Sequence, residues 1–219
     1  MNRAVIFANG AIKDYALILP MLQPRDFVMA ADGGLKHIHR LKLKPALLIG
    51  DLDSISPSDL DLAEFQKTEI IRFEKDKDET DLELAIKIAM ERGYRDMLII
   101  AGLGGRIDHT LANILLMLHP DFQRCRIKFD DGVEEVFLIT DKEEIKGEVG
   151  DIVSLIPFNG DCEGVKTENL KYPLQNESLL AFKTKGISNV MISNSASVSL
   201  ESGTAYCIHI RKNLWKEKT

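Results

Sequence analysis

Short apolar runs alternate with amphipathic segments over about the first 130 residues. Five runs of mostly apolar residues predict strands, at 5–8, 27–31, 46–49, 70–73 and 97–101. Near-continuous apolarity indicates strands that are buried on both faces, as in a parallel sheet. The segments between them carry helical periodicity, so we expect an α/β sandwich with right-handed crossovers.

Two helices are predicted most clearly between these strands. The first covers Leu82–Arg92, preceded by a capping-box pattern of Thr80 and Glu83 and followed by Gly93, where a C-terminal cap belongs. The second covers about Asp108–Leu118. Its apolar positions recur at helical spacing and predict an inner face made of Leu111, Ile114, Leu115 and Leu118.

After about residue 131 the pattern changes to short, β-rich, alternating runs. They predict strands at 135–140, 152–156, 189–193, 196–200 and 204–210. Turn signals such as Asn159-Gly160 and Ser202-Gly203 separate them, which predicts a small antiparallel sandwich or barrel. The change lies near Asp130-Asp131-Gly132, so we expect an α/β domain over residues 1–131 and a β domain over residues 132–219.

Composition narrows the classes of function. The chain has 219 residues, 45% hydrophobic and 28% charged, which supports a sizeable core. A net charge of −6 without a Lys/Arg cluster argues against a nucleic-acid partner. No apolar run approaches the roughly 18 residues that span a bilayer, and Met1–Ala8 predicts a strand rather than a signal peptide. We expect a reducing cytoplasm, because the three cysteines are scattered: Cys125, Cys162 and Cys207.

Acidic and glycine-rich segments follow four of the predicted strands. They are Asp32–Gly34, Gly50–Ser54, Glu74–Asp81 and Gly102–His109. The carboxyl ends of parallel strands share one edge of a sheet, and open α/β sheets bind their ligands there. Paired carboxylates repel each other unless a divalent cation lies between them, and hard oxygen ligands suit Mg²⁺.

The chemistry of this edge fits a nucleoside triphosphate held through Mg²⁺. A carboxylate cluster alone repels phosphate, whereas a shared cation links the two; the acids concerned are Asp51, Asp53, Asp76, Asp78 and Asp81. Glycines allow close approach of backbone N–H groups to phosphate or base, at Gly33, Gly34, Gly102, Gly104 and Gly105. Arg106 could stabilise charge on the transferred group. No P-loop motif is present.

Each of these segments also has a simpler interpretation. Asp53 or Ser54 could cap a turn, Asp32–Gly34 could be a turn, and Asp78–Asp81 a solvated helix start. Asp108 could be an N-cap, and His109 a structural histidine. Convergence on one edge favours a shared site. The remaining histidines show no partner pattern and receive no role: His37, His39, His119 and His209.

Taken in chain order, the motifs resemble the thiamine pyrophosphokinase family. The resemblance spans nearly the whole chain and rests on Ala31–Gly34, Gly50–Ser54, Asp76–Asp81 and Gly104–His109, with weaker matches in Gly164–Leu174 and Gly186–Asn189. It implies a Rossmann-like α/β sandwich with a mostly parallel sheet that binds the nucleotide, followed by an antiparallel β-sandwich that binds thiamine. Members transfer a pyrophosphoryl group from ATP to the hydroxyethyl oxygen of thiamine and release AMP, as homodimers with the active site at the subunit interface.

The resemblance also implies roles for individual residues. Catalytic roles fall to Asp51, Asp78, Asp81 and Arg106, and Mg²⁺ is held by Asp51 and Asp53 with Asp78 or Asp81. Nucleotide-binding roles fall to Asp32, Gly33, Gly34, Asp76, Thr80, Gly104, Gly105, Arg106, Asp108 and His109. Thiamine is expected to contact Asp81, Tyr172, Ser188 and Asn189. Tyr172 stands where some members carry tryptophan, and the sequence does not choose a general base among the acids of 76–81.

Two other functions use the same residues. In a Mg²⁺-dependent phosphohydrolase Asp51 would be a covalent nucleophile and Asp53 the general acid. That motif usually follows the first strand, whereas here it follows about the third, and Asp32 and Arg106 stay unused. A non-catalytic thiamine or nucleotide sensor has little need for so many metal-binding acids.

Overall fold

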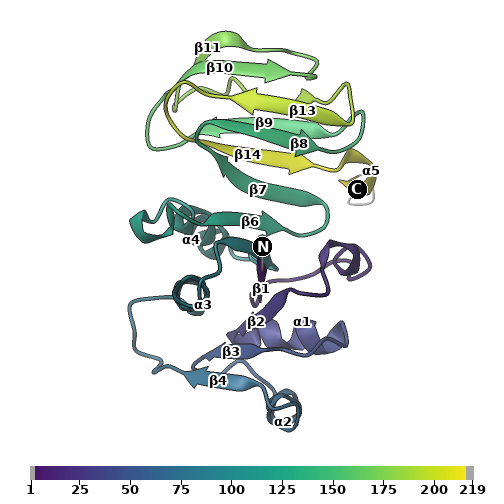
Figure 1. Cartoon of the computed structure of the whole chain (residues 1–219), viewed down its shortest axis with the longest axis vertical. Helices are drawn as coiled ribbons and strands as arrows, with labels where there is room; N and C mark the ends of the chain where they lie inside the picture. The colour runs from purple at the N-terminus through teal and green to yellow at the C-terminus, as the bar shows by residue number, and fades with distance from the viewer. Residues whose placement is uncertain (1–2, 216–219) are drawn as a thin grey trace. The chain divides into compact units, whose positions relative to one another are not determined.

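The computed structural model describes residues 3–215, and the chain divides into two compact units, residues 1–132 and 133–219 (Figure 1). No helix within residues 3–215 is long and apolar enough to cross a bilayer. The first unit alternates strands with helices, and the second contains mainly strands. The difference in pattern between the two parts of the sequence therefore corresponds to two different kinds of unit.

A parallel sheet forms the centre of the first unit. Its strands lie in the order β6-β5-β1-β2-β3-β4, each parallel to its neighbours. The bounds are β1 (Arg3–Phe7), β2 (Phe27–Ala31), β3 (Leu47–Gly50), β4 (Glu69–Arg72), β5 (Asp96–Ile100) and β6 (Arg126–Asp130). The predicted α/β fold with parallel strands is confirmed, but the edge strand β4 has no buried residue, so the prediction of burial on both faces is wrong for it. Strand β6 is an additional strand that the sequence analysis did not predict.

Helices cover both faces of this sheet. They are α1 (Leu35–Arg40), α2 (Pro57–Phe65), α3 (Asp81–Glu91) and α4 (Ile107–Leu116), with 3-10 turns η1 (Leu19–Met21), η2 (Asp32–Gly34) and η3 (Pro120–Phe122). Alternate strand residues such as Phe7 and Leu48 share one apolar cluster with Ile38 of α1 and Ala63 of α2. Helix α3 contacts β1, β2 and β3 and lies across the sheet from α1 in Figure 1. Both faces are thereby shielded from water.

The predicted helix start at Thr80 is confirmed. The hydroxyl oxygen of Thr80 accepts a hydrogen bond from the backbone N–H of Glu83 at 3.2 Å, which satisfies one of the open donors of the first turn of α3. The helix buries Leu82, Ala85, Ile86 and Ala89. This hydrogen bond therefore fixes the end of the loop between β4 and α3, which carries several acidic and basic side chains.

The prediction that Leu111 and Leu115 lie on a buried inner face of α4 is wrong. Leu111 is 56% exposed and Leu115 is 43% exposed, and Ile107, one turn earlier, is 76% exposed. No described residue of α4 is buried. Periodicity identifies an apolar stripe on a helix, but it does not identify what covers that stripe, and nothing in residues 3–215 fully covers this one.

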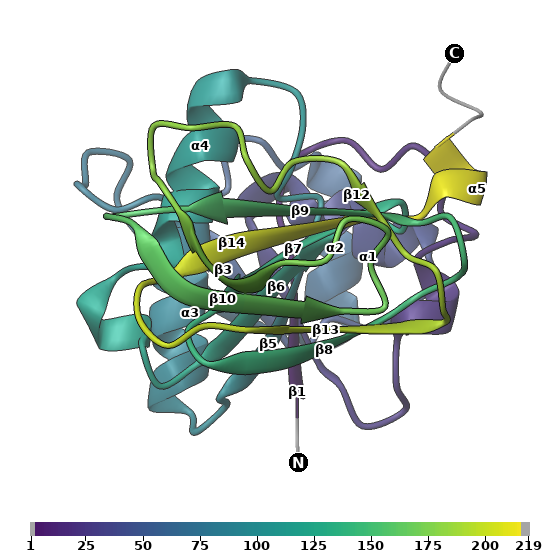
Figure 2. The ribbon, with the colours of Figure 1, turned by 90° about the horizontal axis from the view of Figure 1, so that it is seen from above.

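The second unit is an antiparallel β-sandwich. One layer has the order β12-β9-β14-β7 and the other β11-β10-β13-β8. In Figure 2, β10, β13 and β8 lie side by side. The bounds are β7 (Glu134–Ile139), β8 (Lys142–Lys146), β9 (Ile152–Pro157), β10 (Cys162–Glu168), β11 (Gln175–Leu179), β12 (Asn189–Val190), β13 (Ser195–Ser199), β14 (Ala205–Ile210) and the short helix α5 (Lys212–Trp215).

Side chains from both layers form the core of the sandwich. Phe137 and Leu155 come from one layer and meet Val165, Leu179 and Val198 from the other. Alternation of inward apolar and outward polar residues is therefore the basis of this unit, as in other antiparallel sandwiches. The strand expected at 189–193 is shorter than predicted, since β12 contains only Asn189 and Val190.

Candidate functional site

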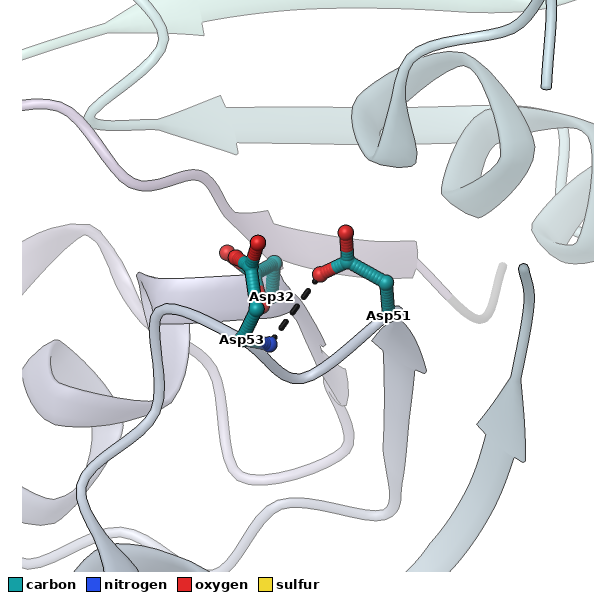
Figure 3. Close-up of side chains that lie close together, drawn as sticks. All are labelled: Asp32, Asp51 and Asp53. Atoms are coloured by element: carbon teal, nitrogen blue, oxygen red, sulfur yellow. Dashed lines mark hydrogen bonds between the residues drawn. The ribbon is translucent and has the colours of Figure 1, made fainter. Parts of the chain in front are cut away.

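Three carboxylates meet at the carboxyl ends of two neighbouring parallel strands. Asp32 follows β2, and Asp51 and Asp53 follow β3. One carboxylate oxygen from each lies within 4.8 Å of the other two, and Figure 3 shows the three side chains close together. Gly50 permits this approach, because a Cβ at that position would lie 3.0 Å from the Cβ of Asp32.

Asp32 has an unusual backbone conformation and is buried. Its backbone has a φ of 46°, a left-handed conformation that aspartate tolerates better than most residues, and only 7% of the residue is exposed. Its Oδ1 atom is buried and has no hydrogen-bond partner among the described residues. A buried carboxylate oxygen without a partner costs stability, and a bound cation or a hydrogen-bond donor would remove that cost.

The other two carboxylates are partly paired. Asp51 Oδ1 accepts the backbone N–H of Asp53 at 3.1 Å, which fixes the turn after β3. Asp53 accepts hydrogen bonds from Lys75 Nζ at 2.6 Å and from the Ser54 hydroxyl at 3.1 Å, and these bonds lower the pKa of Asp53. Three oxygen ligands of this kind, one of them without a partner, fit the coordination chemistry of Mg²⁺.

The cluster lies in the wall of a cavity of about 710 Å³ in the first unit. The loops that follow β1 and β5 also line it, at 8–11 and at 101, 102 and 104–106. These two strands are neighbours at the point where the strand order reverses, and ligands bind to open α/β sheets at such points. Polar lining residues are Asn9, Asp32, Asp51, Asp53, Ser54, Lys75, Lys77, Glu79, Thr80, Asp81, Arg106, His109 and Asn113.

Most of the predicted nucleotide and metal residues come together here. The residues that line the cavity are Asp32, Asp51, Asp53, Thr80, Asp81, Gly104, Gly105, Arg106 and His109. Gly33, Gly34, Asp76, Asp78 and Asp108 are not among them. Gly34 has a packing role, since a Cβ there would lie 1.9 Å from the carbonyl oxygen of Phe7. The turn that carries Asp32 can thereby pack against the end of β1.

Asp108 pairs with Arg106 at the start of α4. The guanidinium donates from Nε to Oδ1 at 3.1 Å and from Nη2 to Oδ2 at 2.5 Å. This pairing is the main reason why the pKa of Asp108 falls to about 2. The N-cap position of α4 belongs to Arg106, so the alternative of Asp108 as the N-cap is wrong.

Asp81 faces the same cavity from the first turn of α3. Burial raises the pKa of Asp81, the nearby Lys77 opposes that shift, and the carboxylates of Asp32 and Asp51 add to it. Lys77 Nζ lies 2.9 Å from Asp81 Oδ1. Asp81 is thus a fourth aspartate in the cavity wall, whereas Asp78 does not line the cavity.

Sequence reasoning missed the loop after β1 as part of the site. Asn9 and Gly10 line the cavity, and Lys36 Nζ donates to the Asn9 side-chain oxygen at 2.7 Å. The loop has no acidic residue, but it follows a strand of the same sheet, and that position is the signal that could have identified it. Asn113 of α4 also lines the cavity and donates to the Gly102 carbonyl oxygen at 2.8 Å.

A second cavity, of about 320 Å³, lies in the β-sandwich unit. Tyr172 and Asn189 line it, whereas Ser188 does not. Ser188 has a φ of 58°, and its backbone N–H donates to the Ser154 hydroxyl at 3.0 Å. Further lining residues are Val153, Leu155, Leu170, Pro173, Leu174, Glu177, Thr184, Lys185, Gly186 and Ile187.

Family models match both units. A model described as the thiamin pyrophosphokinase catalytic domain matches residues 19–129, about half of the chain, and one described as the vitamin B1 binding domain of the same enzyme matches residues 139–205. The chain belongs to the thiamine pyrophosphokinase family. All three carboxylates of the cluster lie within the first match, and Tyr172 and Asn189 lie within the second.

Relatives and solved structures agree with this assignment. Thiamine pyrophosphokinase of Bacillus subtilis strain 168 is 32% identical over 162 residues, covering 73% of this chain and 75% of the relative. Thiamine pyrophosphokinase 2 of Arabidopsis thaliana is 27% identical over 209 residues, 84% of this chain and 78% of the relative. The crystal structure of the Bacillus subtilis enzyme superposes with a TM-score of 0.87 at 25% identity, covering 96% of this chain and 99% of that one. A thiamin pyrophosphokinase family protein from Enterococcus faecalis gives 0.82 at 28% identity, covering 95% and 99%.

These matches bear on the alternatives. The thiamine pyrophosphokinase family accounts for both units, whereas Asp51 and Asp53, the residues that the phosphohydrolase alternative uses, both lie in the first. The phosphohydrolase alternative gains no support from them.

Proposed function

We propose that the protein transfers a pyrophosphoryl group from ATP to the hydroxyethyl oxygen of thiamine, giving thiamine diphosphate and AMP. The observation that carries this proposal is the group Asp32, Asp51 and Asp53 in the wall of a large cavity, in a chain of the thiamine pyrophosphokinase family. The oxygen of thiamine attacks the β-phosphorus of ATP, and the bond between the α,β-bridging oxygen and the β-phosphorus breaks. The α/β unit is the nucleotide-binding part, and the β-sandwich is the thiamine-binding part.

Four carboxylates are proposed to hold Mg²⁺. Asp32, Asp51 and Asp53 offer oxygens within 4.8 Å of one another, and the unpartnered Asp32 oxygen supports a cation there. Asp81 joins them from α3. The sequence placed Asp32 in the nucleotide site and Asp78 or Asp81 at the metal; the cavity wall favours Asp32 and Asp81 as metal ligands. When bound, Mg²⁺ supplies positive charge that neutralises phosphate oxygens.

The phosphates are proposed to bind where the loop after β5 meets α4. Gly104 and Gly105 line the cavity with φ values of 80° and 76°, and no atom lies within 4 Å of a Cβ at either position. Open backbone at the N-terminus of a ten-residue helix favours anionic groups. Arg106 and His109 line the same region and supply positive charge and hydrogen-bond donors. Positioning and electrostatics of this kind are the main requirements of phosphoryl-type transfer, so no dedicated base is needed.

Thiamine is proposed to bind against the β-sandwich at the cavity lined by Tyr172 and Asn189. The aromatic ring of Tyr172 is largely exposed and can face a cationic thiazolium ring. Both polar groups of the Asn189 side chain form hydrogen bonds with backbone atoms, of Tyr172 and Val190. We therefore propose that Asn189 positions Tyr172 rather than contacting the substrate.

We also propose a homodimer with the active site at the subunit interface, in a reducing cytoplasm. The apolar stripe Ile107, Leu111 and Leu115 on α4 supports an interface, because exposed apolar patches mark binding surfaces. Cys125 and Cys162 are free thiols, which supports the reducing compartment.

Incubation of the protein with ATP, Mg²⁺ and thiamine tests the activity. AMP should form only when all three are present, and a chelator of divalent cations should stop it. AMP formation at the same rate without thiamine would contradict the proposal and indicate a hydrolase.

A further inference from the structure

Two lysines of the loop between β4 and α3 make ion pairs inside the nucleotide cavity. Lys75 Nζ lies 2.6 Å from Asp53 Oδ2, and Lys77 Nζ lies 2.9 Å from Asp81 Oδ1. Both lysines line the cavity. The Lys77 side chain is only 15% exposed, so its charge lies in the cavity wall rather than in bulk water.

The partners of these lysines are carboxylates that we assign to Mg²⁺. A divalent cation coordinates oxygen at about 2.0–2.1 Å and repels an ammonium group that contacts the same carboxylate. Metal and lysine therefore compete for Asp53 and for Asp81. Before any metal enters, the lysines reduce the repulsion among the acidic groups of the cavity, which number five among the described lining residues: Asp32, Asp51, Asp53, Glu79 and Asp81.

A lysine displaced by the metal remains beside the nucleotide. Its flexible four-carbon stem lets the ammonium group move by several ångströms without a change in the backbone, and lysine binds phosphate as a point charge. If Mg²⁺ arrives with a nucleoside triphosphate, the phosphate oxygens would offer the displaced ammonium group a new anionic partner.

We propose that Lys75 and Lys77 exchange partners during nucleotide binding. They hold Asp53 and Asp81 in the substrate-free protein and bind the polyphosphate once Mg²⁺ occupies those carboxylates. The inference rests on the proposed function only in requiring a Mg²⁺-bound nucleoside triphosphate in this cavity. Lys77 should affect the affinities for metal and nucleotide more than Lys75 does, because its ion pair is more buried and exposed ion pairs contribute little.

Binding measurements without catalysis test the exchange. One titration follows Mn²⁺ alone, in place of Mg²⁺, by electron paramagnetic resonance. A second follows the Mg²⁺ complex of α,β-methylene-ATP by calorimetry, since that analogue cannot be cleaved at the reacting bond. Lys77→Met should bind Mn²⁺ more tightly than the wild type, because a competing cation is gone, and should bind the Mg²⁺–nucleotide complex about tenfold more weakly. Lys75→Met should change both affinities in the same directions by less.

Lys166 provides a control. It also pairs with a carboxylate, Glu201 at 3.4 Å, and neither of these residues lines the cavity. Lys166→Met should leave both affinities unchanged, and Lys77→Arg should retain nucleotide binding. Thermal unfolding verifies that each variant is folded.

The opposite signs of the two effects decide the outcome. If Lys77→Met weakens both titrations, the lysine has a structural role and the exchange is refuted; unchanged affinities also refute it. Failure of thiamine-dependent AMP formation would refute the proposed activity. The two titrations would still test the exchange of partners, because they do not depend on catalysis. The two proposals can thus fail separately.

Discussion

The side-chain amide of Asn189 holds both backbone groups of Tyr172. Its Oδ1 accepts the Tyr172 N–H at 2.9 Å, and its Nδ2 donates to the Tyr172 carbonyl oxygen at 2.6 Å. Asn189 is 7% exposed, whereas Tyr172 is 61% exposed. A buried amide thus sets the backbone position of an exposed aromatic ring at the rim of the second cavity.

Replacement of this amide tests whether Asn189 acts through Tyr172. Asn189→Asp removes the donor and places a carboxylate oxygen against the Tyr172 carbonyl oxygen, so the KM for thiamine should rise about tenfold with kcat little changed. Tyr172→Ala should raise KM by a similar factor. The double variant should be no worse than the worse single variant; fully additive losses would mean that Asn189 contacts thiamine itself.

Asp32→Asn should separate stability from activity. Asparagine tolerates the positive φ at this position and replaces a carboxyl group whose buried Oδ1 atom lacks a partner, so the metal-free protein should unfold at a higher temperature than the wild type. Turnover should fall more than about a hundredfold, because a proposed metal ligand is lost. Calorimetry and an AMP assay measure the two effects, with the exposed Asp61→Asn on α2 as the control. Retained turnover would remove Asp32 from the metal site.

His209 should make stability depend on pH. It is fully buried, with Nδ1 3.0 Å from Glu135 Oε1 and Nε2 2.9 Å from Asp151 Oδ2. Burial lowers the pKa of His209, but the hydrogen bonds to Glu135 and Asp151 outweigh burial, so the pKa is raised. Because the folded pKa exceeds the unfolded one, the stabilisation is complete below about pH 6.5 and is lost as the pH rises through the folded pKa.

Thermal unfolding across a pH series measures this effect. The difference in Tm between the wild type and His209→Gln should be largest near pH 6 and should shrink toward alkaline pH. The difference also removes the contribution of His37, whose pKa burial lowers to about 4 in both proteins. A difference that grows with pH would contradict a protonated His209.

The apolar stripe on α4 should govern assembly. Leu111→Asp places a charge in the centre of the stripe, so dimers that bury this face should dissociate into folded monomers, as sedimentation would show. Phe65→Asp is the control, because Phe65 is 85% exposed on α2, outside the stripe. An unchanged sedimentation profile for Leu111→Asp would place the interface elsewhere.

The acidic residues that follow parallel strands allowed much of the candidate site to be predicted from sequence. Parallel strands bring their carboxyl ends to one edge whatever lies between them, so the segments that carry Asp32, Asp51 and Asp53 could be placed at one edge from the sequence. The sequence assigned Asp32 to the nucleotide, and only the fold brings it within reach of Asp51 and Asp53. The position of Asp78 could not be predicted in this way, because the loop after β4 turns some acids into the cavity and others out of it. Lys75 and Lys77 could not be assigned for the same reason, since the conformation of this loop also decides which of its lysines line the cavity.

The two edge strands of the second layer of the sandwich, β8 and β11, escaped prediction for another reason. Strand β8 has the sequence Lys-Glu-Glu-Ile-Lys, and Ile145 is its single fully buried side chain. Edge strands of a sandwich need few apolar residues, so a search for apolar runs does not find them. Helix α4 is the opposite case, because it has an apolar pattern that no described residue fully covers.

Transfer of the pyrophosphoryl group is tested most directly by following the γ-phosphorus of labelled ATP in a reaction with Mg²⁺ and thiamine. The account predicts that the label appears in the terminal phosphate of thiamine diphosphate, with one AMP formed for each labelled product. ADP together with labelled thiamine monophosphate would contradict it.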